Sequence, residues 1–273
     1  MRILVFGSSG YAGQKIKSRL AQEYKYVFGT YHNSVSEFEL EDATMYSFDL
    51  RSLGSLTNLL LETKPTVIIY CLRGDFAQQL SAVRVMAQYI QEKETGKMVF
   101  LSTSNVFDGA LSAPHYEDEP PKADTDYGKF KIECENILQT TIMNKSVILR
   151  IPQIYGKNCP RLNRLKEASS NGETLNTIKN LFVNYTTDEY IADWILYILK
   201  NNLTGVFHIG SEDIIDYYAF QVMLLNALKI PAPLFSIEEE KEASYQAVLP
   251  HRNDIPDWLK FKVVDVIHQM MPL

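Results

Sequence analysis

The sequence predicts an α/β protein whose strands form a doubly wound, parallel sheet. Three observations predict this fold: short apolar runs alternate with amphipathic helical stretches, the first run is apolar throughout, and regularly spaced glycines follow it. Continuous apolar runs are typical of parallel strands that are buried on both faces. We expect strands at residues 3–6, 26–29, 45–48, 67–71, 98–101 and 147–150, and helices at 14–24, 53–63, 78–94 and 126–143.

The glycine turn after the first strand predicts a nucleotide site. Gly7, Gly10 and Gly13 recur every three residues between the first strand and the first helix. Glycines at such a turn allow the backbone to approach a pyrophosphate closely, and the amides at the helix start, from Tyr11 and Ala12, then face the phosphates. The alternative is a glycine-rich turn that binds no ligand.

A tyrosine and a lysine four residues apart predict acid–base chemistry. Tyr127 and Lys131 project from one face of the expected helix. A phenol titrates near pH 10, but a nearby ammonium group favours the phenolate and lowers that pKa. A hydroxyl from Ser102 or Thr103, at the end of the fifth expected strand, would orient the same substrate oxygen. The alternative is an ordinary solvated helix face.

Composition excludes several classes of function. A hydrophobic content of 46% and a charged content of 22% are ordinary for a globular protein. The net charge of −6 argues against a nucleic-acid surface, and no apolar stretch approaches the roughly 20 residues of a membrane span. Three scattered cysteines and five isolated histidines form no metal motif, so we expect no metal and a reducing, cytoplasmic location.

These motifs together resemble the extended short-chain dehydrogenase/reductase family. The glycine turn, the strand-end Thr103 and the Tyr127–Lys131 pair occur in the family's order and spacing. The run 102–109 (Ser-Thr-Ser-Asn-Val-Phe-Asp-Gly) is similar to the Ser-Thr-Asp-Tyr-Val-Phe-Asp-Gly run of the dTDP-4-dehydrorhamnose reductase subfamily. Residues 114–117, 127–135, 149–150 and 155–156 extend the likeness, which covers roughly the first 200 residues.

The resemblance implies two parts and one reaction. Residues 1–155 would form an NAD(P)-binding Rossmann domain, and 156–273 a smaller C-terminal substrate-binding lobe interleaved with it. The second half reads as a polar loop with a short helix at 159–177, helices at 188–199 and 217–228, and a strand at 205–210. Thr103, Tyr127 and Lys131 would be catalytic. Hydride would pass from the nicotinamide to a carbonyl carbon, Tyr127 would protonate the alkoxide, Lys131 would hold the nicotinamide ribose and lower the tyrosine pKa, and Thr103 would position the carbonyl oxygen.

The resemblance also assigns the cofactor positions. Asp49 and Leu50 would contact adenine, although Asp49 alternatively caps the next helix, for which Ser52 is an equally good candidate. No acid follows Thr30 at the second strand end, and His32 is placed to neutralise a phosphate, so NADP is expected, with NAD left open. The alternative for His32 is a plain surface residue. Cys71 and Leu72 would also lie beside the cofactor and contact it.

Arg73 follows that segment and is unexpected in the family. The sequence leaves three roles for Arg73 open: binding a phosphate, binding a substrate group, or turning outward to solvent.

On the substrate side the chain departs from the subfamily. Ser104, Asn105, Gln153 and Arg252 would bind substrate, but Asn105 and Gln153 stand where the subfamily has aromatic residues near the sugar. The implied substrate is a ketone on a nucleotide-linked deoxysugar, and the family often forms homodimers. Dehydration is disfavoured because Ser104-Asn105 replaces the required acid pair. A sugar-nucleotide epimerase and a non-catalytic NADP-binding subunit, like the regulatory subunit of methionine adenosyltransferase, remain as alternatives.

Overall fold

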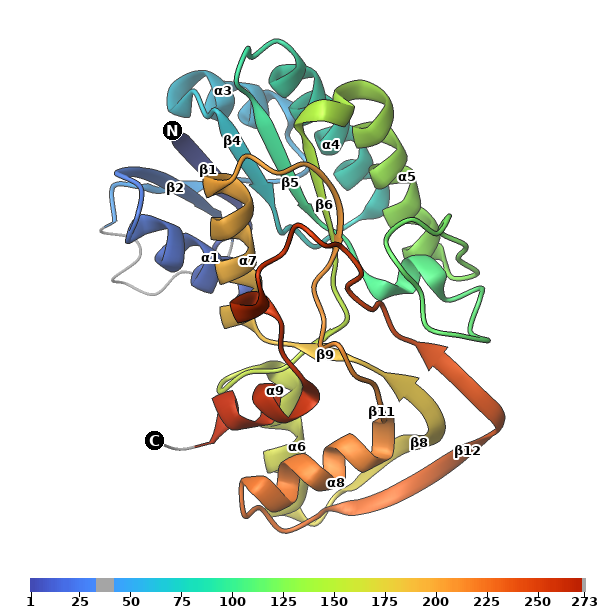
Figure 1. Cartoon of the computed structure of the whole chain (residues 1–273). Coiled ribbons are helices and arrows are strands. Elements are labelled where there is room, and N and C mark those ends of the chain that lie inside the picture. The colour runs from blue at the N-terminus through green and yellow to red at the C-terminus, as the bar shows by residue number, and fades with distance from the viewer. Residues whose placement is uncertain (33–41, 272–273) are drawn as a thin grey trace.

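The main body of the protein is a seven-stranded parallel sheet. The structure is a computed structural model and describes residues 1–32 and 42–271. Strand order is β10-β6-β5-β4-β1-β2-β3, so the direction of chain progression reverses between β1 and β4 (Figure 1). The strands are β1 Arg2–Phe6, β2 Tyr26–Tyr31, β3 Met45–Ser47, β4 Val67–Tyr70, β5 Lys97–Leu101, β6 Ser146–Arg150 and β10 Gly205–His208. The predicted doubly wound fold is confirmed, and ligands in such sheets bind where the order reverses.

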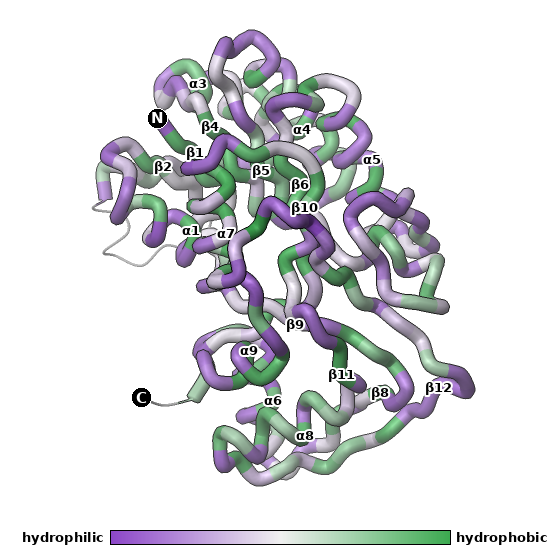
Figure 2. The backbone as a smooth tube through the Cα atoms, viewed as in Figure 1, coloured by the Kyte–Doolittle hydropathy of each residue, from purple (hydrophilic) through white to green (hydrophobic). Residues whose placement is uncertain are grey.

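Helices cover both faces of this sheet. Successive side chains of β1 point to opposite faces, so Ile3 belongs to one apolar cluster and Leu4 to the other. The β5 and β6 segments accordingly appear largely hydrophobic through the middle of the molecule (Figure 2). The first cluster is covered by α1 Tyr11–Ala21 and α7 Asp188–Lys200, and the second by α3 Leu53–Thr63, α4 Phe76–Gln91 and α5 Asp126–Ile142.

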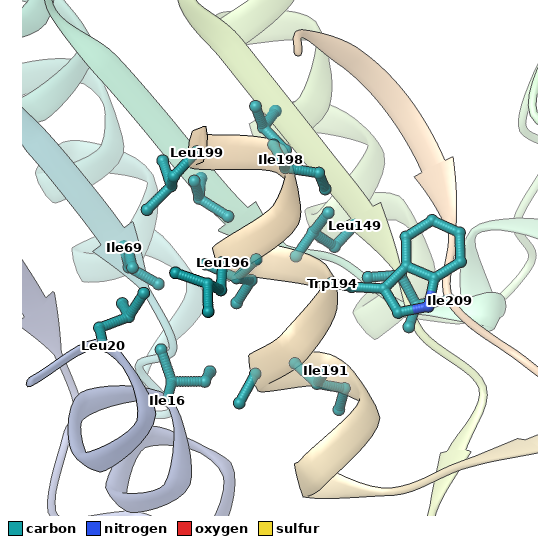
Figure 3. Packing of buried hydrophobic residues seen from close by; sticks show 14 of the residues in the cluster. Ile16, Leu20, Ile69, Leu149, Ile191, Trp194, Leu196, Ile198, Leu199 and Ile209 are labelled. Atoms are coloured by element: carbon teal, nitrogen blue, oxygen red, sulfur yellow. The ribbon is translucent and has the colours of Figure 1, made fainter. Parts of the chain in front are cut away.

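Helix α7 is the most deeply buried of these elements. Its apolar side chains lie between the sheet residues Ile69 and Leu149 on one side and Ile16 and Leu20 of α1 on the other (Figure 3). The buried residues of α7, among them Ile191, recur at helical spacing, which explains why its sequence predicted an amphipathic helix. These contacts join α7, which lies late in the chain, to α1, which follows the glycine turn near the start of the chain.

The smaller lobe packs around a three-stranded sheet of order β11-β8-β12. Its apolar cluster centres on Tyr155, Tyr185 and Phe220, whose rings stack or meet edge to face. The lobe contains α6 Pro160–Asn171, β8 Thr174–Val183, β11 Ile215–Asp216, α8 Tyr217–Ala227, β12 Leu234–Gln246 and α9 Val263–Met270. Two short strands, β7 Gln153–Ile154 and β9 Tyr185–Thr186, pair where the two parts meet.

The short helix expected within residues 159–177 is present and fills most of the segment. The segment forms α6 and the first residues of β8, so it holds less loop than expected. Pro160 begins the helix, and Leu162, Leu165 and Ala168 form one buried face. The remaining positions are mostly polar, which made the segment resemble a loop. By contrast, residues 108–125 are irregular, as expected of the loop beside the site.

The second half of the chain also returns to the main sheet. β10 pairs with β6, and α7 packs on the main-sheet face beside α1 (Figure 1). The domain boundary near residue 155 stays a prediction. Within 1–32 and 42–271 no helix is long and apolar enough to cross a membrane, and no three His, Cys, Asp or Glu residues gather at a metal-binding distance.

Candidate active site

The glycine turn is packed so tightly that side chains do not fit. Gly7 has φ +81°, and a Cβ on it would lie 2.9 Å from the carbonyl oxygen of Cys71. A Cβ on Gly13 would lie 2.2 Å from the carbonyl oxygen of Gly7. Gly10 precedes α1 and gives it no side-chain cap, whereas α3, α4, α5, α7 and α8 are all capped by side chains. The first amides of α1, including those of Tyr11 and Ala12, are therefore suited to an anionic ligand such as a dinucleotide pyrophosphate.

The side chain of Tyr11 turns away from this turn. Its hydroxyl donates to Asp188 Oδ1 at 2.7 Å, and it lies directly over Gly156, where a Cβ would come within 1.9 Å of the hydroxyl. Burial raises the pKa of Tyr11 far above its ordinary value, with Asp188 adding to the shift. Only the backbone of Tyr11 is thus placed for a cofactor, while its side chain ties α1 to α7.

The three predicted catalytic residues come together at the carboxyl ends of β5 and β6. Thr103 is 8% exposed and caps the 3-10 turn Ser104–Phe107, accepting from the Asn105 amide at 3.2 Å. The Thr103 hydroxyl donates to Asn105 Oδ1 at 3.1 Å and lies near enough to the Tyr127 hydroxyl to lower the pKa of that phenol. Lys131 is buried, and its Nζ lies 5.9 Å from the Tyr127 ring centroid. Of the two candidate hydroxyls, Thr103 is the one at the tyrosine, because Ser102 donates to Glu135.

The ionisation of Tyr127 differs from the expectation. Partial burial raises the pKa of Tyr127, which is still 41% exposed, while the nearby Thr103 hydroxyl and the Arg73 charge lower it less, so the net shift is upward. Lys131 does not produce the expected depression, because its Nζ donates to the Leu101 carbonyl at 2.9 Å and lies over the Phe100 ring. A phenol with its ordinary pKa near 10 is already protonated at neutral pH, so the upward shift keeps this donor form and makes the phenol a weaker acid.

Helix α5 approaches the 3-10 turn more closely than any side chain would allow. A Cβ on Gly128 would lie 2.4 Å from the Asn105 carbonyl oxygen. Asp108, which follows the 3-10 turn, accepts from the amide of Asp124 at 2.7 Å and from the Thr125 hydroxyl. Thr125 in turn caps α5 by accepting from Gly128. These contacts fix the position of α5, and therefore of Tyr127, relative to Thr103.

A buried ion pair beneath the site was missed in the sequence. Glu135 accepts from Arg150 Nη2 at 2.9 Å and from the Ser102 hydroxyl, and the side chains of the ion pair are each only 2% exposed. The pair fixes β5 and β6 to α5 next to Thr103. The available signal was the position of Glu135, four residues after Lys131 and so on the same helix face.

The residues predicted to contact the adenosine end gather at the ends of β2 and β3. His32 Nε2 lies 3.7 Å from Asp49 Oδ2. Arg51 binds Asp49 through Nε and Nη2, which together with the backbone amide of Arg51 lowers the pKa of Asp49 well below its ordinary value. Ser52, and not Asp49, caps α3. Thr30 is buried and accepts from the Gly7 amide at 2.9 Å, so its hydroxyl supports the glycine turn.

The segment after β4 faces the glycine turn. The amide of Cys71 donates to Phe6 at 3.0 Å, and Leu72 packs on the second apolar cluster. Burial raises the pKa of the Cys71 thiol to about 12, so it is unreactive at neutral pH. Arg73 is exposed, and its charge acts on Tyr127 and Lys131.

The predicted substrate residues are only partly brought together. Ser104 and Asn105 follow Thr103 directly, and the Ser104 amide donates to Ile151 at 2.9 Å. Gln153 lies in β7, and its Oε1 is buried without a hydrogen-bond partner among the described residues. Arg252 is elsewhere: it pairs with Asp254 at 2.5 Å and donates to the carbonyls of Thr204 and Val206 at the edge strand β10. Its contacts do not include Thr103, Tyr127 or Lys131.

Comparison with known proteins agrees with this geometry. Residues 1–254 match the family model described as the RmlD substrate binding domain. The chain belongs to this family. The family match includes the glycine turn, Thr103, Tyr127, Lys131 and most of the smaller lobe.

Relatives of the chain are distant. The spore coat polysaccharide biosynthesis protein SpsK of Bacillus subtilis is 24% identical over 186 residues, covering 66% of this chain and 62% of SpsK, so the chain spans under two thirds of that relative. Methionine adenosyltransferase 2 subunit beta of Xenopus tropicalis is 23% identical over 261 residues, covering 85% of this chain and 73% of the relative. The solved dTDP-4-dehydrorhamnose reductase of Bacillus anthracis, in complex with NADP, is 17% identical with a TM-score of 0.76, covering 98% of this chain and 96% of that one. This last likeness shows the fold.

Proposed function

We propose that the protein is an NADP-dependent reductase that acts on a keto group of a nucleotide-linked deoxysugar, as dTDP-4-dehydrorhamnose reductases do. The observation that carries the proposal is the grouping of Thr103, Tyr127 and Lys131 beside the uncapped start of α1. A nucleotide site and a proton donor at the same sheet edge are what a nicotinamide-dependent carbonyl reduction requires. Family membership supports the same reaction class.

The chain's own residues supply orientation and a proton. Bound nicotinamide nucleotide supplies the hydride. Thr103, whose hydroxyl otherwise donates to Asn105 Oδ1, would donate instead to the substrate oxygen, and Tyr127 would transfer its proton to that oxygen as negative charge develops. Lys131 lies one helical turn away, with its Nζ 5.9 Å from the Tyr127 ring centroid, and we assign it to holding the nicotinamide ribose. Reduction therefore leaves Tyr127 deprotonated, and a proton from solvent restores it.

The choice of NADP rests on the second strand end. His32 stands there instead of a carboxylate, and its ring lies beside Asp49, which Arg51 neutralises. With Asp49 paired to Arg51, the described residues at this strand end offer no free carboxylate that would hold the ribose hydroxyls of NAD and repel an added 2′-phosphate. The nucleotide-linked sugar is supported by the family match.

The deciding experiment compares wild type with Tyr127→Phe. We expect oxidation of NADPH in the presence of dTDP-4-keto-6-deoxyglucose, and we expect Tyr127→Phe to reduce kcat by roughly 10²- to 10⁴-fold, because the variant cannot donate a proton. NADPH affinity should stay within a few-fold. Tyr26→Phe, which removes a hydroxyl at the opposite end of β2, is the matched control and should retain full activity. Turnover that is equal in Tyr127→Phe and wild type would contradict the proposed acid.

A further inference from the structure

Arg73 lies on a segment whose backbone is fixed from both ends. Cys71, two residues earlier, is held by Phe6 and lies against Gly7. On the other side, Gln79 Nε2 donates to the Gly74 carbonyl at 2.8 Å. A Cβ on Gly74 would lie 3.3 Å from Leu50 at the end of β3. The position of the Arg73 backbone is thus set by the sheet rather than by a loose loop.

The arginine side chain itself is uncommitted. Arg73 is exposed, and within residues 1–32 and 42–271 it makes no hydrogen bond and no ion pair. The nearby acid Asp75 is used otherwise, since its carboxylate caps α4 by accepting from Gln78 at 3.0 Å. The other cation of the site, Lys131, is buried and donates to the Leu101 carbonyl. Arg73 is therefore an exposed cation at this edge whose donors are free for a ligand.

The surroundings of Arg73 define what it can reach. On one side stands the glycine turn, whose backbone Cys71 touches. On the other stands Tyr127, whose ring lies 6.1 Å from that of Phe76, three residues after Arg73. The positive charge of Arg73 lowers the pKa of both Tyr127 and Lys131, although burial is the larger influence on each, which agrees with this placement. Arg73 thus stands between the predicted phosphate site and the proton donor.

We propose that Arg73 is a ligand-binding residue that holds diphosphate oxygens at the mouth of the site, opposite the amides of the glycine turn. A guanidinium group binds two oxygens of one phosphate at once, and an oxyanion held between it and the first amides of α1 would be contacted from both sides. The inference rests on the proposed function, which brings two diphosphates to this edge of the sheet. One belongs to the cofactor and the other to the nucleotide-linked substrate.

The test uses Arg73→Met, Arg73→Lys and Arg84→Met, with NADPH and dTDP as probes. Arg84 is a matched control because it is an exposed arginine of α4 that pairs with Glu133 and lies outside the site. Affinity for NADPH is measured by fluorescence titration. Affinity for dTDP is measured by calorimetry in saturating NADPH. Neither readout depends on turnover.

We expect Arg73→Met to raise one of the two dissociation constants roughly 10- to 100-fold, because a charge-assisted contact is lost. Arg73→Lys should recover part of this loss, and Arg84→Met should match wild type. A raised constant for NADPH identifies the cofactor as the source of the diphosphate. A raised constant for dTDP alone identifies the substrate.

Unchanged affinity for both probes in Arg73→Met would overturn the proposal while leaving the reductase assignment intact. Failure of wild type to bind NADPH would instead remove the proposed function, and the role of Arg73 with it.

Discussion

Lys131 carries its ammonium group into an environment that disfavours charge. It is 5% exposed, and its contacts are the Leu101 carbonyl and the faces of Phe100 and Phe130. Burial lowers the pKa of Lys131 to about 8, although Glu135 and two thiols act in the opposite direction. The residue is retained at a cost to stability, which is typical of groups kept for chemistry.

This cost predicts a pH dependence of folding. An unfolded lysine titrates near 10.4, so between about pH 8 and that value the unfolded chain binds more protons than the native one at this position, and stability rises with pH across the window. Lys131→Met should therefore raise the free energy of unfolding at pH 7 by up to roughly 3 kcal/mol relative to wild type, and the difference should shrink toward pH 10. Urea denaturation of the ligand-free protein at several pH values measures it.

Lys129→Met, an exposed neighbour on the same helix, controls for removal of a lysine and should show no such pH-dependent difference. If the free energies of unfolding of Lys131→Met and wild type differ by a constant amount from pH 7 to pH 10, the pKa of Lys131 is not lowered as described.

At the scale of elements, α1 and α5 are the two helices that position the site, and they are held in place by different contacts. Polar contacts join α1 to α7 along their length: Tyr11 to Asp188, Lys15 to Glu189 and Arg19 to Asp193, each within 2.7 Å. The ion pairs are exposed and each contributes well under 1 kcal/mol, so the apolar face between the helices supplies most of the attachment. Helix α5, by contrast, makes a close backbone approach at Gly128, besides its contacts through Thr125 and Glu135.

Gly128→Ala tests that approach. The added methyl group would meet the Asn105 carbonyl oxygen at 2.4 Å, so α5 must move away from the 3-10 turn. We expect a loss of roughly 1–3 kcal/mol in stability and a fall in kcat of at least tenfold, because Tyr127 moves relative to Thr103. NADPH affinity should change far less than kcat.

Gly54→Ala is the matched control, since a Cβ on this helical glycine of α3 meets nothing within 4 Å. It should leave kcat unchanged and stabilise the protein by about 0.4–1 kcal/mol. Equal kcat in Gly128→Ala and wild type would show that the helix position does not govern proton transfer.

At the scale of the whole molecule, local sequence patterns predicted the main sheet. They did not predict contacts between residues that are far apart in the sequence. Most of the strands were predictable because they are short, largely apolar runs. Thr103 follows β5, and Tyr127 lies in the first turn of α5, which begins at the same edge of the sheet. The extent of helix α6 was harder to predict, because its polar positions outnumber its buried ones. The Glu135–Arg150 pair was missed because no local pattern joins residues on separate elements.

Another such contact joins segments more than ninety residues apart. Glu117, in the loop beside the site, accepts from the amides of His208 at 3.1 Å and His251 at 2.9 Å. The amide of His115 donates to Ala247 at 3.0 Å. The segment after β12 thereby returns from the smaller lobe and fastens the loop to β10.

His208 makes this junction sensitive to acid. The residue is fully buried, its Nδ1 lies 3.1 Å from the Leu249 carbonyl, and its Nε2 has no partner among the described residues. Burial lowers the pKa of His208 to about 3, and the charges of Arg150 and His115 add to this, against the Leu249 hydrogen bond. An unfolded histidine titrates near 6.5, so below that pH the unfolded chain takes up a proton that native His208 does not, and stability falls as the pH is lowered toward 3.

His208→Gln should remove this contribution of His208 to the loss of stability at low pH, while keeping a donor toward the Leu249 carbonyl. Wild type should lose about 1.4 kcal/mol more per pH unit than the variant between pH 6 and pH 4, measured by urea denaturation. His268→Gln, an exposed histidine of α9, should follow the wild-type slope. If His208→Gln and wild type lose stability in parallel on acidification, the junction does not depend on a neutral His208, and the acid response arises elsewhere in the molecule.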